Sequence, residues 1–293
     1  VYAAFTATVR TYTVRFYNGS TLLQTSTNIP YGGSASYTGT TPVDPTGEGR
    51  DFEGWSPSPS NITGNTDCYA QYASALEVAE ITDTWEQILA AVADGTYSTK
   101  YKVGNYKPLV LGDRGTVNMQ IAGFDKDALA DGNGTAAITW IAMSSCVYLW
   151  MNDTATNAGG WANSRLRSRL RNEIFPDIPD YVRTSIKEVT KYYLCRDSDA
   201  GTLAVSDTVW IPSVREVMGV AFEGNAESSG PDYTELFQDI DSCIRLNLVG
   251  EPYYWWLRST ASDTQKFRVI SSRGTLDSQF ADYGPGTVLC FCT

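Results

Sequence analysis

The sequence contains no histidine in 293 residues. Histidine is the commonest general acid or base in enzymes and the commonest protein ligand of transition metals. It is also the side chain whose charge ordinarily changes near neutral pH. Its absence removes all three of these uses at once. This absence is the strongest single argument in the sequence against an enzyme function.

Paired cysteine motifs are missing as well. The six cysteines show no C-x-x-C spacing, so the pattern indicates neither a zinc site nor a disulfide scaffold. We interpret them as isolated buried thiols and predict a protein with no cofactor and no bound metal. They are Cys68, Cys146, Cys195, Cys243, Cys290 and Cys292.

Long apolar runs and an excess of basic residues are also absent. No stretch approaches the roughly 20 apolar residues of a transmembrane helix, so we expect no membrane insertion. The chain has 22 basic and 33 acidic residues, which gives a formal net charge of −11. Such a charge repels phosphate backbones, and we therefore expect no nucleic-acid partner.

Aromatic residues, in contrast, are plentiful. They make up 12% of a chain that is 42% hydrophobic and 19% charged, a composition that excludes disorder as the main state. Aromatic rings fill cores, but they also serve as rigid contacts on recognition surfaces. The chain is long enough for two domains with separate cores.

Residues 11–75 have the pattern of short strands separated by turns. Alternation over Tyr12–Phe16, an Asn18-Gly19 turn and a returning segment at residues 21–27 predict a β-hairpin. Further strands are expected at residues 52–55 and 66–72. Residues 1–6 resemble residues 68–73, so we expect residues 1–10 to be the last strand of a preceding copy, with at least one further repeat upstream.

This segment shares its motifs with a known family: Tyr12-Thr-Val-Arg-Phe16, Tyr31-Gly32-Gly33, Phe52-x-Gly54-Trp55 and Tyr69-Ala70-Gln71-Tyr72. They resemble the Listeria-Bacteroides repeat, which is related to internalin B-repeats. The resemblance implies a small β-grasp-like module, arranged in tandem as a stalk on bacterial surface proteins and some phage proteins. Arg50 departs from the family, which usually has an aromatic residue there.

Residues 76–293 change to an α+β pattern. Asp83-x-x-Glu86 predicts a capped start for a helix that continues to Val92 and stops at Gly95. Further helices are expected at residues 164–175, 182–189 and 231–241, and a short one is expected after the Ser213-x-x-Glu216 capping box. The predicted strands are residues 108–111, 116–124, 137–143, 209–212, 253–257, 267–270 and 288–291.

A second set of motifs follows in fixed order: Gly159-Gly160-Trp161, Trp210-Ile211-Pro212-Ser213, Tyr254-Trp255-Trp256-Leu257-Arg258-Ser259 and Tyr283-Gly284. Together they resemble an uncharacterised domain family of gut bacteria and their phages, with the formylglycine-generating-enzyme type of C-type-lectin fold. The resemblance implies a C-type-lectin-like domain over residues 76–293. It also implies kinship with the target proteins of diversity-generating retroelements, whose ligand-binding residues lie near the C-terminus.

Two features of this domain have a functional and a structural interpretation. Enzymes of this fold use a pair of nearby cysteines, so Cys290 and Cys292 suggest a copper enzyme of the formylglycine-generating type, but their spacing departs from the enzyme pattern. We favour buried apolar thiols. Arg165, Arg167, Arg169 and Arg171 suggest an anion or nucleic-acid site. Because the leucines between them have helical core spacing, we favour arginines on solvated faces.

These patterns predict a non-catalytic receptor-binding or adhesion module, displayed on a phage virion or on a bacterial cell surface. The expected partner is a host cell-surface protein or glycan. Other virion or surface-protein subunits are further expected partners, and display of this kind is compatible with a homo-oligomer. The alternatives are a structural virion decoration protein without a ligand, and the copper enzyme.

We expect the ligand on loops between Ser259 and Tyr283, with aromatic support from residues 253–255. Short polar side chains there can adapt their hydrogen bonds to a ligand, although the same residues are ordinary loop formers. The candidate ligand-binding residues are Tyr253, Tyr254, Trp255, Ser259, Thr260, Ser262, Asp263, Ser271, Ser272, Arg273, Asp277, Ser278, Asp282 and Tyr283.

Overall fold

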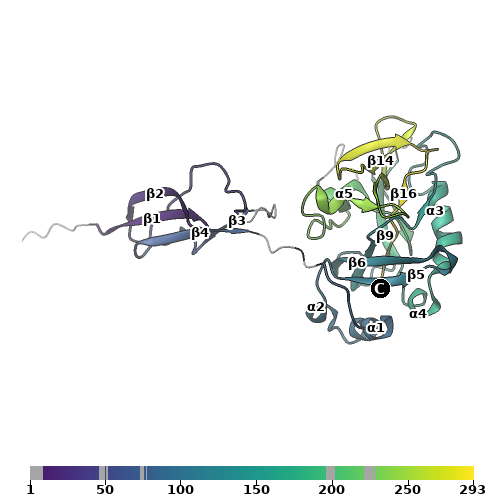
Figure 1. Cartoon of the computed structure of the whole chain (residues 1–293), viewed down its shortest axis with the longest axis horizontal. Coiled ribbons are helices and arrows are strands. Elements are labelled where there is room, and N and C mark those ends of the chain that lie inside the picture. The colour runs from purple at the N-terminus through teal and green to yellow at the C-terminus, as the bar shows by residue number, and fades with distance from the viewer. Residues whose placement is uncertain are drawn as a thin grey trace, which may run out of the picture. The chain divides into compact units, whose positions relative to one another are not determined.

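The computed structural model describes residues 9–45, 50, 52–72, 76, 78–195, 202–220, 227 and 229–293. The chain divides into two compact units, residues 1–75 and residues 76–293 (Figure 1). The change of sequence pattern falls at the same boundary. The strand expected at residues 1–10 lies outside the described residues except for its last two.

The first unit is a four-stranded sheet of β1 (Thr11–Asn18), β2 (Thr21–Pro30), β3 (Phe52–Ser56) and β4 (Thr66–Tyr72). The strand order is β2-β1-β4-β3, and the central pair β1 and β4 is parallel while both outer pairs are antiparallel. The predicted hairpin is confirmed. Gly19 at its turn has φ +55°, a left-handed conformation that glycine adopts at little cost.

The core of the first unit lies on one face of this sheet. Val14 and Phe16 are two positions apart on β1, so both side chains point to that face, and both are fully buried. The Phe16 and Trp55 ring centroids are 4.7 Å apart in an edge-to-face arrangement. Cys68 of β4 is buried in the same cluster, with Ala35 and Ile62.

The second unit contains two larger sheets. One has the order β17-β7-β6-β5 and the other has the order β15-β14-β13-β16-β8. The first sheet consists of β5 (Tyr106–Val110), β6 (Thr116–Phe124), β7 (Ile138–Ala142) and β17 (Cys290–Cys292). The second consists of β8 (Val147–Tyr148), β13 (Trp255–Thr260), β14 (Lys266–Ile270), β15 (Leu276–Phe280) and β16 (Gly286–Thr287).

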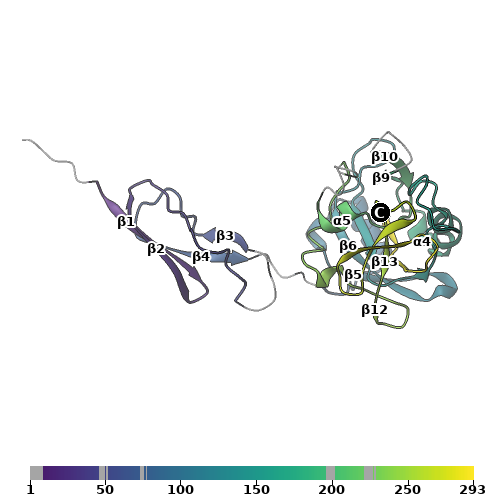
Figure 2. The ribbon, with the colours of Figure 1, turned by 90° about the horizontal axis from the view of Figure 1, so that it is seen from above.

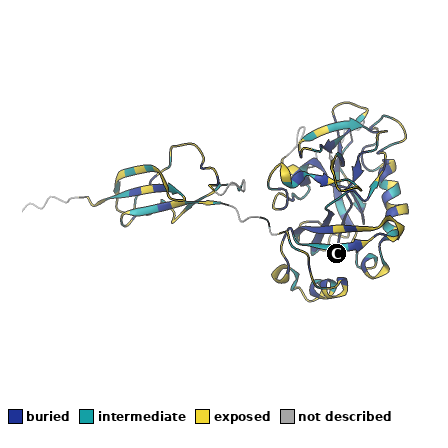
Figure 3. Ribbon diagram, in the orientation of Figure 1, coloured by how far each residue is buried: buried dark blue, intermediate teal, exposed yellow. Residues whose placement is uncertain are grey.

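Two short hairpins complete the strands of this unit. They are the pair β9 (Val189–Leu194) and β10 (Thr202–Asp207), and the pair β11 (Arg245–Leu246) and β12 (Pro252–Tyr253). In Figure 2 the β9–β10 hairpin and β12 lie on opposite sides of the unit. The interior strands are almost entirely buried, and exposure is concentrated in the loops and on the helices (Figure 3).

The described helices are short and lie around these sheets. They are α1 (Trp85–Ala93), α2 (Tyr97–Lys100), α3 (Arg165–Arg169), α4 (Asp180–Arg183) and α5 (Val214–Met218), the π-helical turn η2 (Leu170–Ile174), and the 3-10 turns η1 (Gly112–Arg114), η3 (Phe175–Asp177) and η4 (Asp241–Cys243). This mixture of helix and sheet is compatible with the predicted α+β class. No described helix is long and apolar enough to span a membrane.

The first helix begins as predicted, but its capping box is shifted by one residue. Thr84 and Gln87 make the reciprocal bonds: the Gln87 amide donates to the Thr84 hydroxyl, and the Thr84 amide donates to Oε1 of Gln87 at 2.8 Å. The sequence pattern had predicted Asp83 as the N-terminal cap of this helix. Its carboxylate instead accepts a hydrogen bond of 2.7 Å from the Tyr101 hydroxyl. The second predicted box, Ser213 with Glu216, is confirmed.

Two predicted helices are wrong. In place of a helix over residues 182–189, α4 ends at Arg183 and Val189 begins strand β9, whose residues alternate between buried and half-buried. An alternation with a period of two, which is typical of a strand, starts at Val189. It was missed because Val182, Ile186 and Val189 also have the spacing of a helix. Residues 231–241 form turns, followed by η4. The expected strand at residues 209–212 is reduced to a bridge between Trp210 and Cys290.

We expect Phe16→Ala to destabilise the first unit by about 3–5 kcal/mol, because it removes a fully buried ring and leaves a cavity. Hydrogen exchange of the full chain, followed by mass spectrometry, should show faster exchange in peptides from β1 and β4. Leu22→Ala is the control, since Leu22 is 49% exposed on β2. Equal exchange rates in both variants would contradict this account of the core.

Candidate functional site

Four charged side chains lie buried at the centre of the second unit, and we call them the ionic network: Asp127, Lys191 of β9, Glu216 of α5 and Arg258 of β13. The Lys191 ammonium donates to the Asp127 carboxylate and, over 3.1 Å, to Oε1 of Glu216. The Arg258 guanidinium donates to both oxygens of Glu216, at 2.6 and 2.8 Å. Two cations thus face two carboxylates, and the formal charges cancel.

Neighbouring polar groups complete the hydrogen bonding of this network. The Tyr233 hydroxyl lies 3.0 Å from Nζ of Lys191 and 3.0 Å from Oδ2 of Asp127. Thr139 donates to the same carboxylate. The Lys191 ammonium also lies 3.8 Å from the centroid of the Trp210 ring, a cation–π contact. Each buried charge therefore has several partners, which a desolvated ion requires.

The charges of the network hold one another in the ionised state. Burial alone would raise the pKa of Glu216, but the nearby Arg258 and Lys191 cations outweigh it and lower that pKa to about 2. Burial would lower the pKa of Lys191, yet the carboxylates of Asp127 and Glu216 raise it above its ordinary value. The ion pairs therefore persist through the physiological pH range.

Cys290 and Cys292 border the ionic network but are closed off from solvent. Both are fully buried, and burial raises the pKa of each thiol well above its ordinary value. The Cys292 sulfur lies 3.4 Å from Oγ1 of Thr139. All six cysteines are buried, which confirms the prediction of buried thiols. A neutral thiol is a poor nucleophile and a poor metal ligand, and no substrate reaches these two without an opening of the core.

Within the described part of the chain, no group of three or more His, Cys, Asp or Glu side chains is arranged to hold a metal ion. The acidic side chains of the ionic network are already occupied by Lys191 and Arg258. The arrangement can therefore brace the domain.

Four of the predicted ligand-binding residues are buried, so their assignment to ligand contact is wrong. They are Trp255, Ser259, Thr260 and Ser271, each at most 6% exposed. The first three belong to β13, which lies between β14 and β16 and is covered on both faces. Trp255 donates to the Cys243 carbonyl at 3.0 Å. The Ser271 hydroxyl instead closes the β14–β15 turn with Thr275, at 2.8 Å.

The remaining predicted residues are exposed or half-buried, but they divide between two ends of the β14–β15 hairpin. One end holds Ser262 and Asp263 together with Asp282 and Tyr283, because the Ala281 amide donates to the Gln265 carbonyl at 2.9 Å. Ser272 and Arg273 lie at the other end, about 13 Å away along strands that rise about 3.3 Å per residue. Asp277 and Ser278 lie on β15 between these two ends, whereas Tyr253 is the last residue of β12 and Tyr254 precedes β13.

The loop that carries Ser262 and Asp263 is held in place by a buried side chain. Nδ2 of Asn157 donates to the carbonyl oxygens of Ala261, Asp263 and Lys266, at 3.2, 2.9 and 3.0 Å. Asn157 itself is 2% exposed. An amide nitrogen shared among three carbonyls fixes the loop backbone, so its exposed side chains project from a fixed frame.

Four exposed aromatic side chains of the second unit lie on neighbouring segments, and we call them the aromatic surface: Tyr148, Trp150, Tyr253 and Tyr283. They are 39%, 52%, 38% and 56% exposed, respectively. A single exposed apolar side chain is normal on a protein surface, but several gathered in one place indicate a contact for a partner. Tyr253 and Tyr283 were predicted from the sequence, and Tyr148 and Trp150 were missed.

Three chain segments bring these rings to neighbouring positions. The Tyr148 and Tyr253 rings meet edge to face, with centroids 5.6 Å apart. Trp150 lies against Gly284, where an added Cβ would be 3.8 Å from the indole Nε1. The Asn152 amide donates to the Ala281 carbonyl at 2.9 Å, and the Gly286 amide donates to the Tyr254 carbonyl at 2.8 Å. These backbone bonds fasten the three segments side by side.

The missed residues have a signal in the sequence. Along residues 148–151, Leu149 and Met151 are buried while Tyr148 and Trp150 are exposed. Tyr148 and Trp150 are two positions apart and therefore point to the same side. A half-buried extended segment ordinarily has polar residues at its outward positions, so aromatic residues there indicate a contact surface.

The family scan gives one match, to the Domain of unknown function (DUF6273), over residues 139–289. The chain belongs to this family. The matched region includes all four residues of the aromatic surface, and Lys191, Glu216 and Arg258 of the ionic network. A search of curated proteins and a search of solved structures each gave no match.

We expect Lys191→Met to destabilise the second unit by about 3–5 kcal/mol, because it leaves the buried Asp127 carboxylate without its cation. Urea denaturation of the full chain measures this loss. Lys266→Met is the control, since the Lys266–Asp263 pair is 27% and 43% exposed and such pairs contribute at most about 1 kcal/mol. If the ionic network contributed nothing to stability, Lys191→Met and Lys266→Met would have the same urea denaturation midpoint.

Glu227 is a further buried carboxyl group, next to the network. It accepts a hydrogen bond of 2.7 Å from the Ser259 hydroxyl. Burial raises the pKa of Glu227 to about 7, although the Arg258 charge opposes the shift. A carboxyl with a raised pKa binds its proton more tightly in the folded state than in the unfolded state. Its contribution to stability is therefore present at acidic pH and is lost as the pH rises through about 7.

We expect the wild-type chain to lose stability between about pH 4.5 and pH 7, by on the order of 3 kcal/mol from this group. Glu227→Gln carries no titrating proton and should flatten that dependence, whereas Glu188→Gln, at an exposed position, should not. Urea midpoints at several pH values provide the measurement. Identical pH profiles for wild type and Glu227→Gln would refute the assignment.

Proposed function

We propose that this chain is a non-catalytic receptor-binding or adhesion module, displayed on a phage virion or a bacterial cell surface. Its second unit binds a host cell-surface protein or glycan. The observation that carries the proposal is the aromatic surface, in which four exposed rings are held by backbone hydrogen bonds between three segments. Tyrosine and tryptophan supply large rigid contact area at low entropic cost and are enriched at recognition sites.

The binding residues of this proposal differ from those expected from the sequence alone. Tyr148, Trp150, Tyr253 and Tyr283 make the aromatic contacts. The exposed polar side chains that border Tyr283 and the Asn157-held loop adapt the hydrogen bonding: Ser262, Asp263 and Asp282. Arg273 at the far end of the β14–β15 hairpin makes no contribution to this surface.

The fold of each unit is also a proposal. The order β2-β1-β4-β3 with a parallel central pair supports a β-grasp-like repeat for the first unit. In the second unit, the last strand β17 returns to the sheet that contains β5 and β6, which supports a C-type-lectin-like domain. On this proposal the first unit is a spacer and the second unit is the recognition domain.

The alternative of a copper enzyme loses support from the burial of Cys290 and Cys292. The alternative of a decoration protein draws on a different observation. Leu248 and Val249, in the β11–β12 turn, are 54% and 78% exposed and would suit contact with other virion or surface-protein subunits, or with a second copy of the chain.

We expect Trp150→Ala and Tyr283→Ala each to weaken binding to the receptor at least about tenfold without lowering the melting temperature, because truncation of an aromatic contact removes much of its binding energy. Fluorescently labelled full chain, applied to a printed glycan array and to intact bacterial and intestinal epithelial cells, measures the binding.

Tyr181→Ala is the matched control, because Tyr181 is 46% exposed on α4 and lies outside the aromatic surface. The control should bind as wild type does. The proposal fails if Tyr181→Ala weakens binding as much as Trp150→Ala, or if neither aromatic-surface variant changes it.

A further inference from the structure

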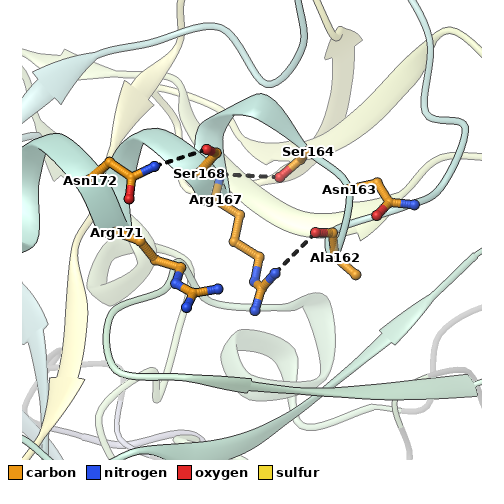
Figure 4. A pocket seen from close by; sticks show the side chains of 7 residues that line it. All are labelled: Ala162, Asn163, Ser164, Arg167, Ser168, Arg171 and Asn172. Carbon is orange, nitrogen blue, oxygen red and sulfur yellow. Dashed lines mark hydrogen bonds between the residues drawn. The ribbon is translucent and has the colours of Figure 1, made fainter.

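A pocket of about 410 Å³ lies beside helix α3 and the turn η2 (Figure 4). Its volume falls within the range of about 300–1,000 Å³ that is typical of small-molecule sites. From the sequence, the four arginines at residues 165–171 were expected on solvated faces of a helix, not at an anion site. The pocket is lined by Ala162, Asn163, Ser164, Arg167, Ser168, Arg171 and Asn172.

Arg167 is fixed at one wall of this pocket. Its Nε donates to Oδ1 of the buried Asp207 at 2.7 Å. Its Nη1 donates to the Ala162 carbonyl at 3.1 Å, and its Nη2 donates to the Ser206 carbonyl at 3.0 Å. Each terminal nitrogen of a guanidinium carries two hydrogens, so Nη1 and Nη2 each keep one for a ligand.

Arg171 brings a second positive charge to the same side. It lies four residues after Arg167, one helical turn away, and Figure 4 shows both guanidinium groups extending in the same direction. Asp207 neutralises Arg167. Among the residues that the structure describes, no carboxylate pairs with Arg171, and none of the lining residues is acidic. The pocket therefore has an uncompensated positive charge.

The other lining groups offer mainly hydrogen-bond donors. Ser164 Oγ already accepts from the Arg167 amide at 3.2 Å, and Ser168 Oγ accepts from Nδ2 of Asn172 at 3.2 Å. Each hydroxyl hydrogen thus remains to be donated. The Asn163 side chain is exposed at the rim and adds an amide. A ligand that matches this lining is rich in acceptors and negatively charged.

We propose that this pocket binds a compact oxyanion, a carboxylate or a sulfate or phosphate group, carried on a ligand of the size of a monosaccharide. Arg171 supplies the main charge, Arg167 the fixed donors, and Ser164 and Ser168 the hydroxyl donors. Charge-assisted hydrogen bonds of this kind are stronger than neutral ones. The site is independent of the aromatic surface, and it goes beyond the receptor binding proposed above.

Isothermal titration calorimetry of the full chain tests this with glucuronate, glucose 6-sulfate and inorganic phosphate, and with glucose as the neutral match. We expect at least one oxyanion to bind with a dissociation constant in the millimolar range or tighter at low salt. We expect no heat from glucose, and weaker binding at high salt. The tightest of the three ligands then assigns the group as a carboxylate, a sulfate or a phosphate.

Arg171→Gln should weaken that binding at least about tenfold, since it removes the uncompensated charge. Arg171→Lys should retain part of the affinity. Arg165→Gln is the matched control, because Arg165 is on the same helix, pairs with Asp153 and does not line the pocket. The proposal is overturned if no oxyanion binds, if glucose binds as tightly, or if Arg171→Gln binds as the wild type does. None of these results bears on Trp150 or on cell binding, so the two proposals fail separately.

Discussion

The second unit depends on the ionic network of Asp127, Lys191, Glu216 and Arg258. These four residues come from a loop, a hairpin strand, a helix and a central strand, and they are up to 131 positions apart (258 − 127 = 131). A buried charge is tolerated only when its partner is in place, so any arrangement that separates one pair incurs the desolvation cost without the compensating attraction. Because each described α-helix of this unit has nine residues or fewer, this requirement fixes the positions of segments that have little regular structure of their own.

The network and the aromatic surface are connected through strand β13. Arg258 anchors this strand to the core, and Trp256, two residues earlier, donates to the Leu149 carbonyl at 2.9 Å. Leu149 lies between Tyr148 and Trp150, the two outward rings of the neighbouring segment. The same strand is preceded directly by Tyr253 and Tyr254. Rigid support of this kind allows a recognition surface to be pre-organised, which lowers the entropic cost of binding.

Elements whose conformation depends on residues close together in the sequence could be predicted from it. The Asn18-Gly19 hairpin and the Ser213 capping box depend on residues next to one another, and both were predicted. Long-range partners were not predictable, since Asp127 and Lys191 are indistinguishable from solvated surface charges until the fold brings them together. Trp255 was placed in the ligand site as aromatic support from the strand expected at residues 253–257, and Ser259 as part of the loop expected after that strand. The sequence did not show that β13 continues to Thr260 and is buried along its whole length. Tyr148 and Trp150 were missed because their alternation spans only a few residues.

Hydroxyl-radical footprinting of the full chain tests whether the aromatic surface contacts the receptor, since it reports the solvent exposure of individual tyrosine and tryptophan rings. The free chain is compared with the chain bound to the glycan or cell surface that retains it. The account predicts that oxidation of Trp150 and Tyr283 falls on binding while oxidation of Tyr181 on α4 stays the same. Protection of Tyr181 or of the first unit, with Trp150 and Tyr283 still oxidised as in the free chain, would contradict it.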